Sequence, residues 1–175
     1  LGDRFSADRL ELMTGLTLAP DPRWSSNFLE WEGDELRFVH DLARESLYAS
    51  LVGEHRRRLH RLAAAVCEGD AATRADHLAR AASDRAATAF LEAAREEIEA
   101  YRFDRARSLL ERGLDCVDSP ETRFALLTRH AWVLRRLGRP SASVDRYREA
   151  LEIAETDADR AGALCGIAAG FRVLE

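Results

Sequence analysis

A spacing pattern in the C-terminal half of the chain limits the folds open to it. At four positions the side chains are small, large, small and large in that order, and the same order of sizes occurs again 37 residues later. The two sets are Ala106, Leu110, Gly113 and Leu114, then Ser143, Tyr147, Ala150 and Leu151. This spacing places all four residues on one face of an α-helix. Small side chains let a neighbouring helix approach closely, and the large one fills the gap beside it. The pattern therefore predicts repeated pairs of packed helices.

Helix-start and helix-stop residues divide most of the chain into helices. Ser6 and Gly15 bound a short one, Ser119 and Pro120 form an N-cap with proline in the first turn, and Gly138 is a C-cap. Further helices are expected at about 41–53, 54–68, 72–82, 85–100 (capped by Ser83-Asp84), 103–117, 120–137, 140–155 and 158–173. The alternation at 35–39 predicts a short strand, and the Pro- and Ser-rich residues 20–34 predict a loop.

The second copy of the pattern resembles a tetratricopeptide repeat. That repeat has Gly, an aromatic residue, Ala and an apolar residue at positions that correspond to Gly138, Tyr147, Ala150 and Ile153. Ser143 stands where the repeat usually has Ala. The offset of 37 residues is close to the period of about 34 residues of such repeats. The resemblance implies an α-solenoid over residues 70–175. Because solenoid repeats need a neighbour or a cap, and because residue 1 is not Met, we expect the native chain to continue beyond this sequence.

Composition narrows the classes of function. The net charge is −5 and all 26 basic residues are arginine, so we expect neither a polyanion-binding protein nor a P-loop lysine. Three widely spaced cysteines favour free thiols in a reducing compartment. No stretch resembles a signal peptide or a membrane span, and no GxSxG or clustered metal ligands occur. These features predict a cytoplasmic, non-catalytic chain without a metal site or a membrane partner.

One stretch has a more specific resemblance. Residues 38–48 have the sequence FVHDLARESLY, and residues 56–60 have the sequence RRRLH. Together they resemble the winged-helix segment of STAND-type signalling ATPases, such as the large LuxR-type bacterial transcriptional regulators. Residues 76–79 and 93–94 resemble the helical segment that follows it. The implied fold is mainly α, with a small winged-helix-like subdomain and connecting helix at residues 1–69, followed by an α-solenoid of TPR-like helix pairs.

The pair His40 and Asp41 is a nucleotide-sensor candidate. Val39-His40-Asp41 resembles the Met-His-Asp motif of related immune-receptor ATPases, in which the histidine contacts the β-phosphate of ADP. A histidine at a strand-to-helix junction lies where a helix N-terminus favours anions. We expect Asp41 to cap that helix and to orient the ring. The alternative is a histidine that only bonds within its turn.

A basic patch is expected on the helix after residue 54. It comprises His55, His60 and the arginines Arg56, Arg57, Arg58 and Arg61. Two interpretations are open: the patch contacts DNA or the acidic surface of a partner, or it is a solvated face whose charges pair with neighbouring acids. The family resemblance argues for an intramolecular role, so DNA would be bound only through another domain.

Three hypotheses of function follow. The first is a sensor and relay segment of a STAND-type transcriptional regulator, whose repeats bind a small-molecule effector or a partner protein and couple this to an adjacent ATPase domain. The others are a stand-alone TPR-like scaffold and a regulatory segment of a cyclase or kinase. No cofactor is expected in this segment, and ATP or ADP is implied for the parent protein.

Overall fold

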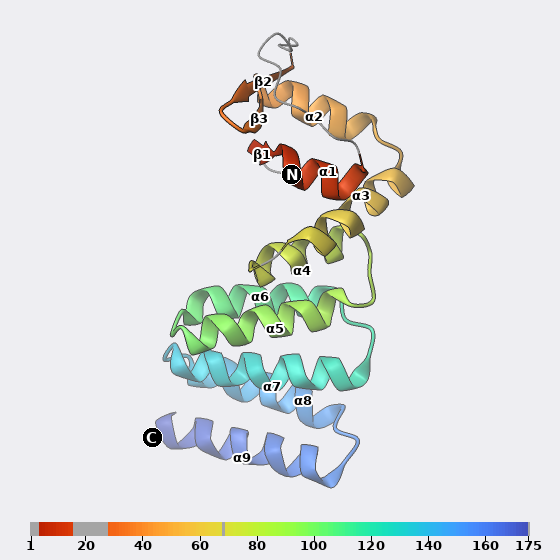
Figure 1. Cartoon of the computed structure of the whole chain (residues 1–175). Coiled ribbons are helices and arrows are strands. Elements are labelled where there is room, and N and C mark those ends of the chain that lie inside the picture. Colours follow the sequence, from red (N-terminus) through yellow and green to blue (C-terminus); the bar gives the residue numbers. More distant parts are fainter. Residues whose placement is uncertain (1–3, 16–27, 68, 175) are drawn as a thin grey trace. The chain divides into compact units, whose positions relative to one another are not determined.

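A computed structural model describes residues 4–15, 28–67 and 69–174 of the chain. The chain divides into two compact units, Leu1–Glu68 (unit 1) and Gly69–Glu175 (unit 2). The described residues are mainly helical, with a small sheet confined to unit 1 (Figure 1). No helix in these ranges combines the length and the apolar character needed to cross a bilayer.

Unit 1 combines a three-stranded antiparallel sheet with three helices. The strands are β1 (Arg4–Ser6), β2 (Leu29–Glu32) and β3 (Glu35–Phe38), in the order β1-β3-β2. The helices are α1 (Ala7–Thr14), α2 (Asp41–Ser50) and α3 (Gly53–Val66). Phe5 pairs with Leu36 across β1 and β3. Both side chains are buried, and so is that of Met13 in α1.

The sheet is larger than the sequence predicts. Residues 35–38 are the expected strand, but the expectation of a loop is wrong for 29–32, and β1 was not expected at all. Residues 20–27 of that expected loop lie outside the described ranges. The reason is pairing across the sheet: Trp31 lies opposite Leu36, and Leu29 lies opposite Phe38. Strands of three or four residues carry little periodicity of their own, so pairing determines them.

Unit 2 consists of six helices. They are α4 (Ala71–Arg80), α5 (Ala86–Glu99), α6 (Phe103–Asp115), α7 (Pro120–Arg136), α8 (Pro140–Glu152) and α9 (Asp157–Leu174). Each packs against the next, and α7 also contacts α5 and α9, so α5, α7 and α9 lie in one layer (Figure 1). Both ends of each of these six helices lie within three residues of the predicted ends.

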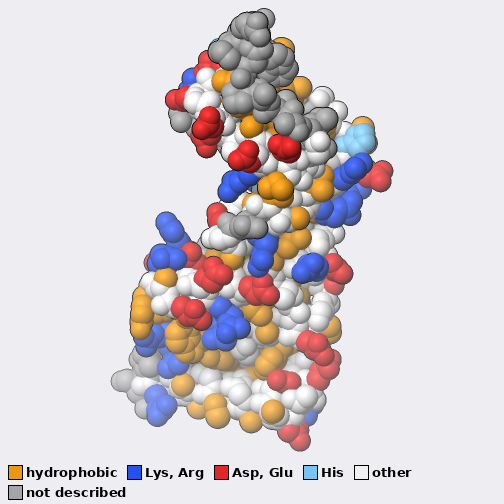
Figure 2. Space-filling view, viewed as in Figure 1, with side chains coloured by type: hydrophobic (Ala, Val, Ile, Leu, Met, Phe, Trp, Pro, Cys, Tyr) orange, Lys and Arg blue, Asp and Glu red, His pale blue; other side chains and the backbone are white. Residues whose placement is uncertain are grey.

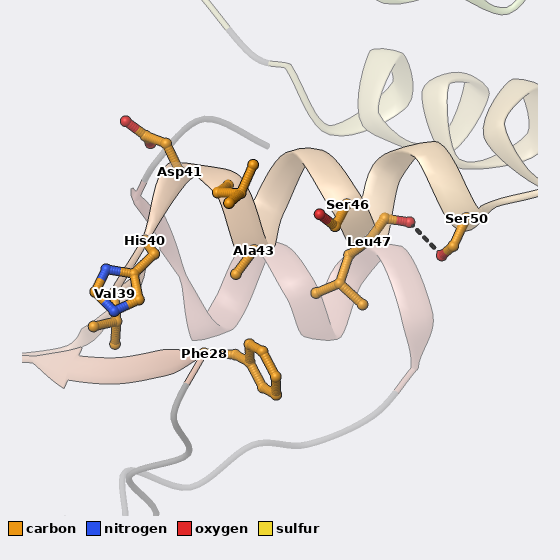
Figure 3. Close-up of a pocket in the computed structure, with 9 residues that line it drawn as sticks. Phe28, Val39, His40, Asp41, Ala43, Ser46, Leu47 and Ser50 are labelled. Carbon is orange, nitrogen blue, oxygen red and sulfur yellow. Dashed lines mark hydrogen bonds between the residues drawn. The ribbon is translucent and has the colours of Figure 1, made fainter.

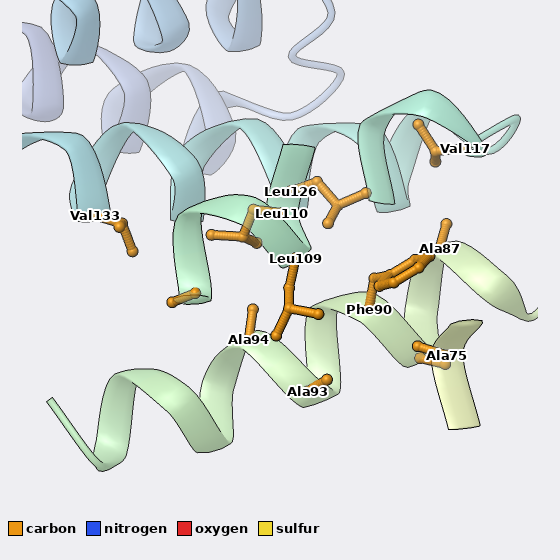
Figure 4. Packing of buried hydrophobic residues seen from close by; sticks show 12 residues of the cluster. Ala75, Ala87, Phe90, Ala93, Ala94, Leu109, Leu110, Val117, Leu126 and Val133 are labelled. Atoms are coloured by element: carbon orange, nitrogen blue, oxygen red, sulfur yellow. The ribbon is translucent and has the colours of Figure 1, made fainter. Parts of the chain in front are cut away.

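The core of unit 2 is built from alanines and a few large side chains. Helix α5 buries Ala86, Ala87, Ala89, Phe90, Ala93 and Ala94. Figure 4 shows Ala93 and Ala94 of α5 beneath Leu109 of α6. A Cβ added to Gly113 would lie 2.9 Å from Cδ2 of Leu126, so the helices approach closely at this glycine. Six of the eight residues of the sequence pattern are buried: Ala106, Leu110, Gly113, Ser143, Tyr147 and Ala150. The other two, Leu114 and Leu151, are partly buried.

Two of the predicted N-caps form, and two do not. The Ser6 and Ser119 side chains accept hydrogen bonds from the backbone N–H of Arg9 and Thr122, at 3.2 and 3.4 Å. The Ser83-Asp84 cap of α5 is wrong, because the N-cap of α5 is Arg85, which makes no side-chain cap bond. The other failure, at the start of α2, concerns the candidate site.

Candidate functional site

His40 lies at the junction between β3 and α2. The Val39 N–H donates to the Phe28 carbonyl at 3.0 Å, which anchors the end of the strand. His40 is the N-cap of α2 with extended backbone angles, and its carbonyl accepts hydrogen bonds from the N–H groups of Ala43 and Arg44. Its side chain makes no cap bond and is exposed. The imidazole has no hydrogen-bond partner among the described residues, so it is available to an external ligand.

Asp41 does not orient the ring, and that expectation is wrong. It is the first residue of α2, one position beyond the N-cap. Its carboxylate is 76% exposed and lies 3.9 Å from the Arg44 guanidinium. Figure 3 shows this carboxylate on the opposite side of α2 from Phe28 and Leu47. A carboxylate in the first turn still interacts favourably with the helix dipole. However, it offers an acceptor to a cation, and an anion near His40 would gain nothing from it.

An open pocket of about 950 Å³ lies along the same helix. Its walls are mostly apolar, and Figure 3 shows Phe28 and Leu47 pointing toward one another below α2. His40 and Val39 lie at the end of the pocket near the helix N-terminus. The lining residues are Phe28, Val39, His40, Asp41, Leu42, Ala43, Ser46, Leu47 and Ser50. Phe28 was not expected here, because its position within a predicted loop gave no sign of a shared wall with α2.

Helix α2 buries none of its ten residues. Leu42 is 73% exposed and Leu47 is 51% exposed. An amphipathic helix is normally held by burial of its apolar face. The apolar face of α2 therefore suits a surface that is not among the described parts of unit 1.

A polar contact joins α2 to α3. The Tyr48 hydroxyl and Nε2 of His60 are 2.9 Å apart, the two rings meet edge to face, and the Arg56 guanidinium lies 5.6 Å from the centre of the Tyr48 ring. Tyr48 and His60 are the last residues of the two motifs on which the STAND resemblance rests. The structure thus brings the ends of the two motifs together.

The predicted basic patch is smaller than expected. His60 is buried and does not belong to it, and Arg56 lies against Tyr48. Arg57, Arg58 and Arg61 are exposed, and Figure 2 shows basic side chains gathered over α3. These three arginines form no ion pair with a described residue, so local charge pairing does not account for them.

Other chemistry finds little support. Within the described ranges, no three His, Cys, Asp or Glu side chains gather where they would hold a metal ion.

The chain matches no model of a known protein family. It also matches no curated protein and no solved structure. The case for a function therefore rests on the residues themselves.

Proposed function

We propose that this chain is a sensor and relay segment of a STAND-type transcriptional regulator. In this proposal, unit 1 is a winged-helix-like subdomain that docks on an adjacent ATPase domain through the face of α2. Unit 2 is an α-solenoid of TPR-like helix pairs that receives an effector or a partner protein. The observation that carries the proposal is that no residue of α2 is buried and that Leu42 and Leu47 are exposed on it, with a histidine at its N-terminal end whose ring has no hydrogen-bond partner among the described residues.

The arrangement of the sheet supports the assignment of unit 1. Strand β1 precedes a helix, and the β2–β3 hairpin then returns to pair with β1. In this proposal, the short hairpin joined to an earlier strand would be the wing of the winged-helix-like subdomain. The contact between Tyr48 and His60 supports it further, since it gives both motif residues a structural role.

The chemistry at His40 supports a phosphate contact. An imidazole N–H and the N-terminus of α2 favour an anion at the same place. Neither group binds nucleotide by itself, because the phosphate-binding loop would belong to the ATPase domain. His40 would therefore stabilise one nucleotide state of that domain, and a relay of this kind works only through unequal affinity for two states.

The test is the His40→Ala variant of the full-length protein. A hydrogen bond to a charged phosphate contributes about 1.5–3 kcal/mol, so we expect ADP to dissociate about tenfold faster or more. Basal transcriptional output should rise with it. Rapid-mixing release of a fluorescent ADP analogue measures the rate. His55→Ala is the matched control, because His55 is an exposed histidine on α3 and does not line the pocket.

The His40 side chain forms no hydrogen bond with a described residue, so its replacement should leave the melting temperature unchanged. Equal ADP release from the His40→Ala, His55→Ala and unmodified proteins would refute the sensor role. A second observation is independent of it: a GxxxxGK[ST] sequence should precede residue 1 in the full-length protein. Its absence would favour the stand-alone TPR-like scaffold, and a neighbouring cyclase or kinase domain would favour a regulatory segment of that enzyme.

A further inference from the structure

Unit 2 contains a hollow that the sequence did not reveal. It has a volume of about 360 Å³ and lies among helices α5, α7 and α8. Leu91 and Arg95 are one turn apart on α5, and the α7 residues are spaced along one face of that helix. The lining residues are Leu91, Arg95, Ala125, Thr128, Arg129, Trp132 and Tyr147. We refer to this site as the arginine hollow.

Two cations in the arginine hollow have no counter-ion. Arg95 and Arg129 are both exposed, and neither forms a hydrogen bond or an ion pair with a described residue. Of the acids next to Arg95 on α5, Glu97 is bound by Arg102, and Glu96 and Glu99 are exposed and do not line the hollow. No acidic residue lines the hollow, although the chain has 31 acids and 26 bases. The site is therefore locally positive within a chain of net negative charge.

The remaining walls are apolar and aromatic. Trp132 is partly buried, and one side of it lies against Phe103 and Arg136. Tyr147 is buried against α9, where a Cβ added to Gly166 would lie 2.4 Å from the Tyr147 ring. Burial raises the pKa of the Tyr147 phenol, so it stays protonated and can donate. The Thr128 hydroxyl donates to the carbonyls of Phe124 and Ala125, so it offers a ligand only an acceptor.

We propose that the arginine hollow binds a small organic acid, with its carboxylate held by Arg95 and Arg129 and its apolar body against Leu91 and Trp132. Guanidinium groups are suited to planar carboxylates, which they bind through paired hydrogen bonds. The volume lies at the lower end of the range of small-molecule sites, about 300–1,000 Å³. A nucleic acid would need a longer row of cations than the two present here.

This inference deepens the proposed function, because it names the chemical class of the effector that unit 2 would receive. Glu97, two residues after Arg95, forms its ion pair with Arg102.

The test uses phenylacetate as the probe, measured by isothermal titration calorimetry on the whole chain. Phenylacetamide has the same shape without the charge, and inorganic phosphate has charge without the apolar body. The variants are Arg95→Gln and Arg129→Gln. The matched control is Arg123→Gln, which removes an exposed arginine of α7 that does not line the hollow.

We expect saturable 1:1 binding of phenylacetate and at least tenfold weaker binding of phenylacetamide and of phosphate. Each lining variant should bind phenylacetate about tenfold more weakly, and Arg123→Gln should bind it as the unmodified chain does. All three arginines are exposed, so circular dichroism should show folded variants.

Three results would overturn the inference. They are no binding of phenylacetate at millimolar concentration, binding of phosphate or the amide as tightly as phenylacetate, and equal loss in Arg123→Gln. None of them bears on ADP release from the His40→Ala protein. The inference can therefore fail while the proposed relay stands, and the relay can fail while the hollow still binds acids.

Discussion

Helices α2 and α7 show two ways in which an amphipathic helix is used. Helix α2 buries none of its ten residues, whereas α7 buries six of its 17. The neighbours explain the difference, since α7 packs against α5, α6, α8 and α9, and α2 has few contacts beyond β3. Apolar burial within unit 2 thus fixes α7, while the leucines Leu42 and Leu47 of α2 stay exposed.

The same contrast applies to histidine. His130 of α7 is 2% exposed, and neither ring nitrogen has a hydrogen-bond partner. His40 at the start of α2 is exposed, and its ring is also unpartnered among the described residues. Burial makes a proton on His130 costly, whereas the exposed ring of His40 can receive a ligand. The two histidines therefore differ in what their surroundings allow.

The largest expected difference is between leucines of the two units. Leu110 is fully buried in unit 2, and Leu110→Ala should lower the free energy of unfolding by about 2–5 kcal/mol. Leu42 is 73% exposed on α2, and Leu42→Ala should change it by no more than about 0.5 kcal/mol. Urea unfolding followed by circular dichroism measures both. A comparable loss in Leu42→Ala would mean that the face of α2 is already covered.

A smaller effect is expected from two glycines of α9. In Gly166→Ala the new Cβ would meet the Tyr147 ring, so the free energy of unfolding should fall by about 1–3 kcal/mol. Gly162 has no heavy atom within 4 Å of its added Cβ. Gly162→Ala should therefore raise stability by about 0.5–1 kcal/mol through helix propensity. Thermal unfolding of the pair measures both signs, and equal effects would show that α9 does not pack on Tyr147 as described.

The smallest predicted effect is a dependence of stability on pH. Burial chiefly lowers the pKa of His130, and burial also lowers that of His77. In the unfolded chain both histidines have the ordinary pKa of about 6.5. Below that pH, the unfolded state therefore binds more protons than the folded state does. These two histidines should therefore leave the free energy of unfolding unchanged above that pH. At lower pH they should decrease it, by at most about 1.4 kcal/mol per pH unit for each histidine.

Urea titrations between pH 7.5 and 5.5 test this, with His130→Gln and His55→Gln compared. The first should flatten the pH dependence and the second should leave it as it is. If both variants keep the full slope, His130 is not the responsible group. The charged groups near the His130 ring are Arg107 and Glu111 on α6 and Arg146 and Glu149 on α8.

Local signals in the sequence predicted most of the helical structure. The Ser6 and Ser119 caps act on groups three residues away. Gly138 lies one residue beyond the C-cap of α7, which is Leu137 and not the predicted Gly138, and its φ of 71° favours glycine. By contrast, the turn after α5 contains Tyr101 with a φ of 59°, and nothing in the sequence indicates that conformation for a tyrosine. The strands β1 and β2 were missed for the related reason that distant residues stabilise them.

The candidate site was predicted in part. A resemblance singled out His40, and the structure gives it an exposed ring at a helix N-terminus. The role of Asp41 was wrong, because its position relative to the N-cap determines where its carboxylate points. The arginine hollow was missed because Arg95, Arg129 and Tyr147 come from three helices, and their proximity depends on how those helices pack.

The sequence by itself determined the helices of this protein, the close packing of its repeated small residues and the absence of a P-loop lysine, because each depends on residue type or short-range spacing. Only the tertiary structure decided which apolar faces are buried. It left the face of α2 open and covered that of α7, and it left Arg95 and Arg129 without acids. Burial and charge pairing depend on residues far apart in the chain, so no local pattern contains them.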